Sequence, residues 1–189
     1  MVKVAICGID GAGKTALIKK LLAHYQAIGV SVDKAKVDFP CKEICKTADL
    51  LKEKEIVRIG MAYDFVNYYH RFALSSQLVL CDRFDVCYRV LNRVDKIGKN
   101  LIEQLDKLYS IIEDADLYIL LDIPVDLAAK RLALRGDRAE NESDEILRAM
   151  KRYYNSELAK KKNPVVIDAS QSLEVVFETA KEFIDKLMR

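Results

Sequence analysis

Short runs rich in apolar residues alternate along the chain with longer segments in which apolar residues recur every three or four positions. Such runs predict buried strands, and they lie at residues 2–7, 30–37, 77–81, 117–122 and 165–168. Strands of this kind, separated by helices, are typical of a parallel sheet that helices cover on both faces. We therefore predict an α/β fold with a five-stranded parallel sheet, in a single domain over residues 1–189.

The segments with helical spacing predict the helices between these strands. They run from residue 16 to about 29, over 41–54, about 55–75, about 99–113, from 124, from about 143 to 161, and over 173–188. No internal repeat, low-complexity segment or linker interrupts the pattern. One domain is therefore the simplest interpretation.

A glycine-rich motif follows the first strand and precedes the first helix. Residues 8–15, GIDGAGKT, fit the P-loop pattern G-x-x-x-x-G-K-[ST]. Its glycines allow successive backbone N–H groups and the start of the helix to surround phosphates. Lys14 would reach the β- and γ-phosphate oxygens, and the Thr15 hydroxyl would complete a Mg²⁺ shell. We therefore predict a P-loop NTPase fold that binds ATP and Mg²⁺ through Asp10, Gly11, Ala12, Gly13, Lys14, Thr15 and Ala16.

Composition and charge limit the classes of partner that the chain is expected to bind. With 51% hydrophobic and 32% charged residues and a net charge of +2, the chain has the composition of a soluble protein without a global field for nucleic acid or membrane. No apolar run approaches a membrane span, and the first residues form a strand pattern, not a signal peptide. A cytoplasmic location is the default expectation. Cys7 and Cys81 lie in apolar strands and are expected to be core thiols.

The carboxyl ends of the predicted strands collect further candidate residues. Asp38, Asp82, Asp122 and Asp168 should lie with the glycine loop at one edge of the sheet, where ligands of parallel sheets bind. Asp82 is placed to hold Mg²⁺, and Arg83 to stabilise charge on the transferred phosphoryl group. The alternative is an exposed ion pair at a strand end.

A second group of cations follows the fourth strand. Arg131 and Arg135 share one helical face, and Gly136 should end that helix. Arg138 follows in the polar segment 135–143. These arginines are expected to form a lid that closes over the phosphates and excludes water; a charged helix end at the surface is the alternative.

Together these features resemble the thymidylate kinase family. The resemblance is carried by the loop 8–15, Asp82-Arg83-Phe84, Leu121-Asp122-Ile123-Pro124, the arginines of 131–138 and Ile167-Asp168-Ala169-Ser170. It implies that Lys14, Thr15, Arg83, Arg135 and Arg138 serve ATP and phosphoryl transfer. It also implies that Arg131 and the turn Asp168-Ala169-Ser170 lie against the adenine, that Asp10 lies near a sugar hydroxyl of the acceptor, and that the protein is a homodimer. Gly11 occupies the position where some members carry a catalytic arginine.

The departures from this family fall on the acceptor side. Members usually carry an arginine after the second strand and another on the long third helix, which hold the acceptor phosphate. The corresponding segments read Val37-Asp38-Phe39-Pro40 and Ile59-Gly60-Met61-Ala62-Tyr63-Asp64, and the expected Tyr-Gln-Gly motif is missing after Phe84. Related deoxynucleoside kinases place a carboxylate at the end of the second strand, and Asp38 could accept a hydroxyl proton there.

Three functions therefore remain open. The first is an ATP-dependent kinase of a nucleoside monophosphate, dTMP-like by resemblance. The second is a kinase of a free hydroxyl, on a nucleoside or another small metabolite, and Asp38 favours it. The third is a P-loop switch, although the guanine-reading tetrad N-K-x-D does not occur. Phe39, Tyr63 and Phe65 are candidates for contact with the acceptor, one ring of Tyr63 or Phe65 stacking on its base.

Overall fold

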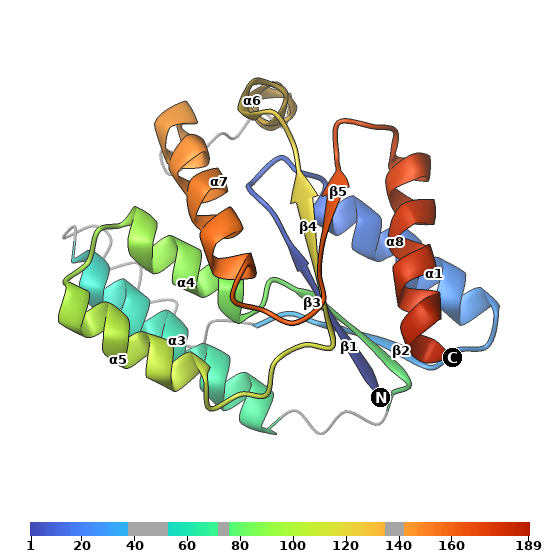
Figure 1. Ribbon diagram of the computed structural model, residues 1–189, viewed down its shortest axis with the longest axis horizontal. Coiled ribbons are helices and arrows are strands. Elements are labelled where there is room, and N and C mark those ends of the chain that lie inside the picture. Colours follow the sequence, from blue (N-terminus) through green and yellow to red (C-terminus); the bar gives the residue numbers. More distant parts are fainter. Residues whose placement is uncertain (38–52, 72–75, 135–141) are drawn as a thin grey trace.

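Five parallel strands form one sheet in the order β2-β3-β1-β4-β5 (Figure 1). The computed structural model describes residues 1–37, 53–71, 76–134 and 142–189. The strands are β1 Val2–Cys7, β2 Val32–Ala35, β3 Leu78–Asp82, β4 Leu117–Asp122 and β5 Pro164–Asp168. In the register of the central strands, Ile6 of β1 lies between Asp82 of β3 and Ile119 of β4. The predicted five-stranded parallel sheet is confirmed.

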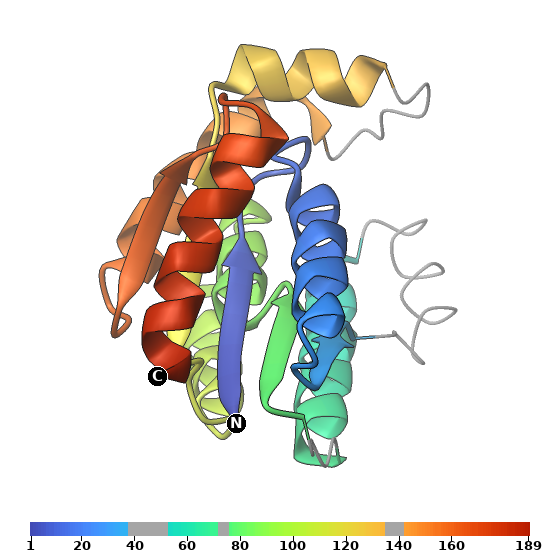
Figure 2. The same cartoon turned by 90° about the vertical axis from the view of Figure 1, so that its right-hand side faces the viewer.

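Helices cover both faces of this sheet, so that the apolar runs of its central strands are buried. Figure 2 shows α1 (Lys14–Ala27) and α8 (Leu173–Met188) on one face. The other face carries α3 (Lys54–Arg71), α4 (Asp85–Val94), α5 (Lys99–Tyr109) and α7 (Asp144–Leu158), and α6 (Val125–Ala133) lies across the carboxyl ends of the strands. Among the described helices, none combines the length and hydropathy needed to cross a bilayer.

Local sequence explains where two of the long helices begin. The hydroxyls of Ser143 and Ser172 accept hydrogen bonds from the backbone N–H groups of Ile146 and Val175, at the starts of α7 and α8. Serine in this position satisfies an N–H group that the helix itself leaves unpaired. The predicted helix over 173–188 agrees with α8 at both ends.

The structure differs from the predicted elements at α4, which sequence periodicity did not indicate. Charged and amide side chains interrupt its apolar residues, yet Asp85, Arg89 and Asn92 are buried. Arg89 pairs with Asp85 at 3.1 Å and with Asp106 of α5 at 3.0 Å. These ion pairs allow a polar segment to pack as a core helix, because buried charges need partners.

Several other boundaries differ. The strand expected over 30–37 is the shorter β2, and the helix expected over 99–113 ends at Tyr109. The helix expected over 41–54 lies almost wholly outside the described residues, as do the last residues of the helix expected to reach residue 75. Cys7 and Cys81 are buried free thiols, as predicted.

Candidate active site

The glycine-rich loop joins β1 to α1 at the carboxyl edge of the sheet. Gly11 and Gly13 have φ angles of 82° and 93°, which glycine adopts without a steric penalty. A Cβ atom on Gly11 would lie 2.6 Å from the carbonyl oxygen of Ala128 in α6. The loop therefore packs directly against α6. A side chain at position 11 would therefore meet the backbone of α6.

Lys14 begins α1, and its ammonium group turns back into the loop. Nζ donates to the carbonyl oxygens of Gly8 at 2.8 Å and Ile9 at 2.9 Å, and it lies 3.5 Å from Asp10 Oδ1. Burial lowers the pKa of Lys14, and the charge of Arg83 lowers it further. The loop thus holds a buried cation at its centre, which a phosphate oxygen can bind in place of the two carbonyl groups.

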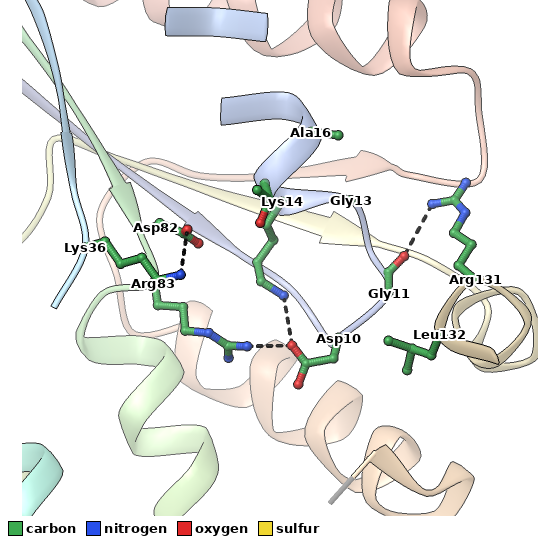
Figure 3. A pocket seen from close by; sticks show the side chains of 11 residues that line it. Asp10, Gly11, Gly13, Lys14, Ala16, Lys36, Asp82, Arg83, Arg131 and Leu132 are labelled. Carbon is green, nitrogen blue, oxygen red and sulfur yellow. Dashed lines mark hydrogen bonds and ion pairs between the residues drawn. The ribbon is translucent and has the colours of Figure 1, made fainter. Parts of the chain in front are cut away.

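Asp10 and Arg83 form an ion pair beside this lysine (Figure 3). Nη2 of Arg83 donates to Oδ1 of Asp10. Burial alone would raise the pKa of Asp10, but the charges of Arg83 and Lys14 outweigh burial and hold that pKa below its ordinary value. Arg83 has a φ of 74°, and a side chain in this region costs about 1–2 kcal/mol. Such strain clusters at functional sites.

Asp82 ends β3 next to Arg83 and is almost fully buried, with 5% of its side chain exposed. Its Oδ2 lies 3.0 Å from Lys34 Nζ and 3.8 Å from Lys36 Nζ. Sequence reasoning missed both lysines, because it searched for arginines beyond the second strand. One feature of the sequence could have indicated them. The two lysines are two positions apart, and this spacing puts both side chains on the same face of β2 and of the residues that follow it.

Most of the predicted nucleotide-binding residues surround one cavity of about 400 Å³. Those that line it are Asp10, Gly11, Gly13, Lys14, Thr15, Ala16, Asp82, Arg83 and Arg131. Lys36 and Leu132 complete the wall. The glycine loop, the start of α1, the segments at the ends of β2 and β3, and α6 therefore meet in one place at the carboxyl edge of the sheet.

A second cavity of about 250 Å³ lies beside the first and shares Gly13, Ala16 and Arg131 with it. Ala12, Ala169 and apolar side chains that include Leu121 and Val176 line the remainder. Arg131 donates to Gly11 O at 3.5 Å and to Ala169 O at 3.1 Å, so its guanidinium bridges the loop and the turn after β5. An apolar wall beside a guanidinium plane suits a heteroaromatic base.

The turn after β5 is ordered by Asp168. Its carboxylate accepts from Ser170 N at 2.9 Å, from Ser170 Oγ at 2.6 Å and from Gln171 Nε2 at 2.9 Å. The bond from Gln171, together with those from Ser170, lowers the pKa of Asp168 to about 2. Asp168 and Ser170 thus shape the turn that presents Ala169 to the second cavity.

Not every predicted site residue falls in this region. Asp38, Phe39, Arg135 and Arg138 lie outside the described residues, as does the lid apart from its end at 142–143. Phe65 is fully buried and packs against the rings of Tyr69, Phe84, Tyr88 and Tyr109. This burial removes Phe65 as a stacking residue, because its ring belongs to the core. Tyr63 is 60% exposed on α3.

The donor set at the loop fits Mg²⁺. Within the described ranges, no group of three or more His, Cys, Asp and Glu residues could form a metal site of its own. Thr15 and Asp82, however, contribute a hydroxyl and a carboxylate to one cavity wall, where Oδ2 of buried Asp82 is held by ion pairs with Lys34 and Lys36. Mg²⁺ prefers one or two such oxygens together with phosphates and water.

The fold and this site define a P-loop kinase. A strand, a glycine loop and a helix hold a buried lysine at the edge of a parallel sheet, next to an Asp-Arg pair at the end of a neighbouring strand. The family model described as thymidylate kinase matches residues 6–180. The chain belongs to the thymidylate kinase family, and it is a phosphotransferase.

Relatives along the whole chain support this assignment. The thymidylate kinase of Idiomarina loihiensis is 26% identical over 199 residues, which cover 98% of this chain and 97% of the relative. The probable thymidylate kinase of Sulfurisphaera tokodaii is 29% identical over 187 residues, covering 96% and 95%. Deoxyadenosine kinase from M. mycoides, with dCMP and dCDP bound, has a TM-score of 0.74 at 19% identity, covering 98% of this chain and all of that one. At that identity the similarity shows the fold alone.

Proposed function

We propose that this protein transfers the γ-phosphate of ATP to a nucleoside monophosphate, and that dTMP is an acceptor. The observation that carries the proposal is the pair of joined cavities. The smaller one offers apolar walls and Arg131 for a base, and the larger one offers Lys14 and Arg83 for phosphates. The relatives that match the whole chain are named thymidylate kinases.

The residues divide this task between them. Arg131 and the turn that Asp168 and Ser170 shape are proposed to hold the adenine at Ala169. Lys14, with the N–H groups of the loop, is proposed to bind the β- and γ-phosphates, and Arg83 to stabilise charge on the transferred group. Asp10 positions Arg83 through their ion pair.

Thr15 and Asp82 are proposed to hold Mg²⁺, which when bound neutralises charge on the phosphates. Arg135 and Arg138, both outside the described residues, are proposed to close over the phosphates and exclude water. Catalysis then rests on positioning and electrostatics, without a covalent enzyme intermediate.

A kinase of a free hydroxyl is the second candidate, and Asp38 is the residue that favours it. Asp38 lies two residues after Lys36, which lines the larger cavity. A carboxylate that follows the second strand could accept the proton of a 5′-hydroxyl, a role that a phosphate acceptor does not require. The two candidates thus differ in the chemistry that Asp38 performs.

An ATP-consumption assay with two acceptor pools separates these candidates. Nucleoside monophosphates, dTMP included, are tested beside the matching nucleosides, with the native chain and with Asp38→Asn. We expect turnover of dTMP that survives Asp38→Asn. Turnover of a nucleoside that collapses in this variant would instead identify a hydroxyl kinase with Asp38 as base. Lys14→Ala provides the background rate, and silence in both pools would contradict the first candidate and direct the search for a hydroxyl acceptor to non-nucleotide metabolites.

We also propose that the protein is a homodimer that associates through α3. Ile56, Ile59 and Tyr63 recur at helical spacing on this helix and are about half-exposed or more. An apolar stripe of this kind suits a second copy of the same helix, because a two-fold interface is self-complementary. Light scattering after gel filtration should give twice the mass of the chain, and Ile59→Glu should give the monomer.

A further inference from the structure

Lys36 follows β2 and forms part of the wall of the larger cavity. Figure 3 shows it on the side of Asp82 and Arg83, at the opposite end of the cavity from Arg131, with Lys14 between them. Under the proposed function, the base of ATP lies at Arg131 and its phosphates lie over the loop at Lys14. Lys36 then stands beyond the γ-phosphate, at the end of the cavity that receives the acceptor.

The charges of this cavity favour an anion at that end. Four cations in its wall, Lys14, Lys36, Arg83 and Arg131, face two carboxylates, Asp10 and Asp82. Asp10 is engaged by Lys14 and Arg83. The excess positive charge therefore lies at the two ends of the cavity. Arg131 is at the end proposed for the base, and Lys36 is at the end proposed for the acceptor.

Lys36 can leave Asp82 without leaving that carboxylate unpaired. Lys34 holds the same Oδ2 at 3.0 Å and is 30% exposed, whereas Lys36 lies at 3.8 Å and is 60% exposed. A pair this long and this exposed contributes little to stability. Buried Asp82 therefore retains Lys34 as its partner when the ammonium group of Lys36 turns to a ligand.

We propose that Lys36 binds the phosphate of the acceptor and makes the enzyme favour a phosphomonoester over the matching free nucleoside. This inference rests on the proposed function and names the cation that its acceptor requires. Both expected acceptor arginines are missing from the sequence, and a lysine on the cavity wall provides the charge from a different position. Arg83, at the same end, provides the second cation for the phosphate.

Steady-state kinetics of Lys36→Met with dTMP as acceptor tests this role. Losing a charge-assisted hydrogen bond should raise the KM for dTMP about 10- to 100-fold. The KM for ATP should change much less, because Lys36 lies at the opposite end of the cavity from Arg131, where the base is proposed to bind. Lys36→Arg should recover most of the affinity, since it keeps a cation on the same wall.

Lys34→Met is the matched control. Lys34 pairs with the same oxygen of Asp82, and it is not part of the cavity wall. Since it leaves the Lys36 ammonium group in place, Lys34→Met should raise the KM for dTMP clearly less than Lys36→Met does. An equal rise in both variants would mean that the effect passes through Asp82, and it would overturn direct binding by Lys36. An unchanged KM for dTMP in Lys36→Met would overturn the inference while leaving the proposed function standing.

Calorimetry gives a readout that does not depend on turnover. The ratio of the dissociation constants of thymidine and dTMP, measured with the native chain and with Lys36→Met, should fall at least about tenfold in the variant. A ratio that stays the same contradicts the inference. Failure of the proposed function is seen separately, in the native chain, as turnover of nucleosides without turnover of any monophosphate.

Discussion

Replacing Gly11 by alanine, and comparing the loss of stability with that at Gly29, should show how much of the loss comes from contact with α6 and how much from the backbone conformation. The new Cβ would lie 2.6 Å from the carbonyl oxygen of Ala128. Since carbon and oxygen atoms of this kind approach to about 3.3 Å, α6 must move away by about 0.7 Å. Arg131 lies on α6, so the same movement displaces the guanidinium group proposed to bind adenine.

The energetic cost has two parts. An alanine at a φ of 82° costs about 1–2 kcal/mol, and forcing apart a packed contact costs about 1–3 kcal/mol. Alanine also lowers the conformational entropy of the unfolded chain, and this stabilises the folded state by about 0.4–1 kcal/mol. We therefore expect Gly11→Ala to lower the free energy of unfolding by about 1–5 kcal/mol.

Gly29→Ala is the control for the conformational part. Gly29 has a φ of 79°, and a Cβ there meets nothing within 4 Å. It should cost only about 1 kcal/mol. Urea unfolding of both variants, with calorimetric titration of a non-hydrolysable ATP analogue, measures the difference. Equal destabilisation in the two variants, or unchanged binding of the analogue in Gly11→Ala, would refute the contact between the loop and α6.

Three further predictions concern charges of the site. Lys14→Ala should lower kcat at least about 10²-fold while circular dichroism shows an intact fold; near-normal turnover would exclude the loop as the phosphate site. Arg131→Met should raise the KM for ATP about tenfold and leave that for the acceptor unchanged, and the reverse pattern would contradict its place at the base. Because the pKa of Asp10 is held below its ordinary value, the stability that its ion pair provides is present above about pH 4 and is lost as the pH falls through the folded pKa. Thermal unfolding from pH 6 to 3 should therefore show a steeper loss for the native chain than for Asp10→Asn, and parallel curves would show that the pair contributes nothing.

The fold could be predicted from sequence where periodicity and burial agree. β3 and β4 are apolar up to a final aspartate and almost wholly buried, and α8 carries an amphipathic pattern with a serine cap. The sequence therefore predicts each of them within about a residue. α4 could not be found in the same way. Its buried charges are neutralised by Asp106 and Glu157 on other helices, and such partners are visible only after the chain has folded.

Some residues of the candidate site could likewise be identified from the sequence, and others could not. Residues tied to a backbone motif, such as Lys14 in the loop and Arg83 after β3, could be named from the sequence because the motif fixes their place. Phe65 could not be assigned, since helical spacing puts it on the same helix as Tyr63 without showing which ring faces the core. The structure separates them, with Phe65 fully buried and Tyr63 largely exposed.

Lys34 and Lys36 show why residues near the end of the cavity proposed for the acceptor escape a search by motif. On an edge strand such as β2, alternating lysines usually serve to keep the edge soluble, and the sequence offers no reason to treat these differently. The strand order shows a second role for these lysines. β2 pairs with β3 and thereby places both lysines beside Asp82. A carboxylate that is proposed to hold a metal cannot be left with two ammonium groups at one oxygen once the metal is bound, because like charges repel. With Mg²⁺ at Asp82, the more exposed Lys36 would be free to face the acceptor, so added Mg²⁺ should strengthen acceptor binding in the native chain more than in Lys36→Met.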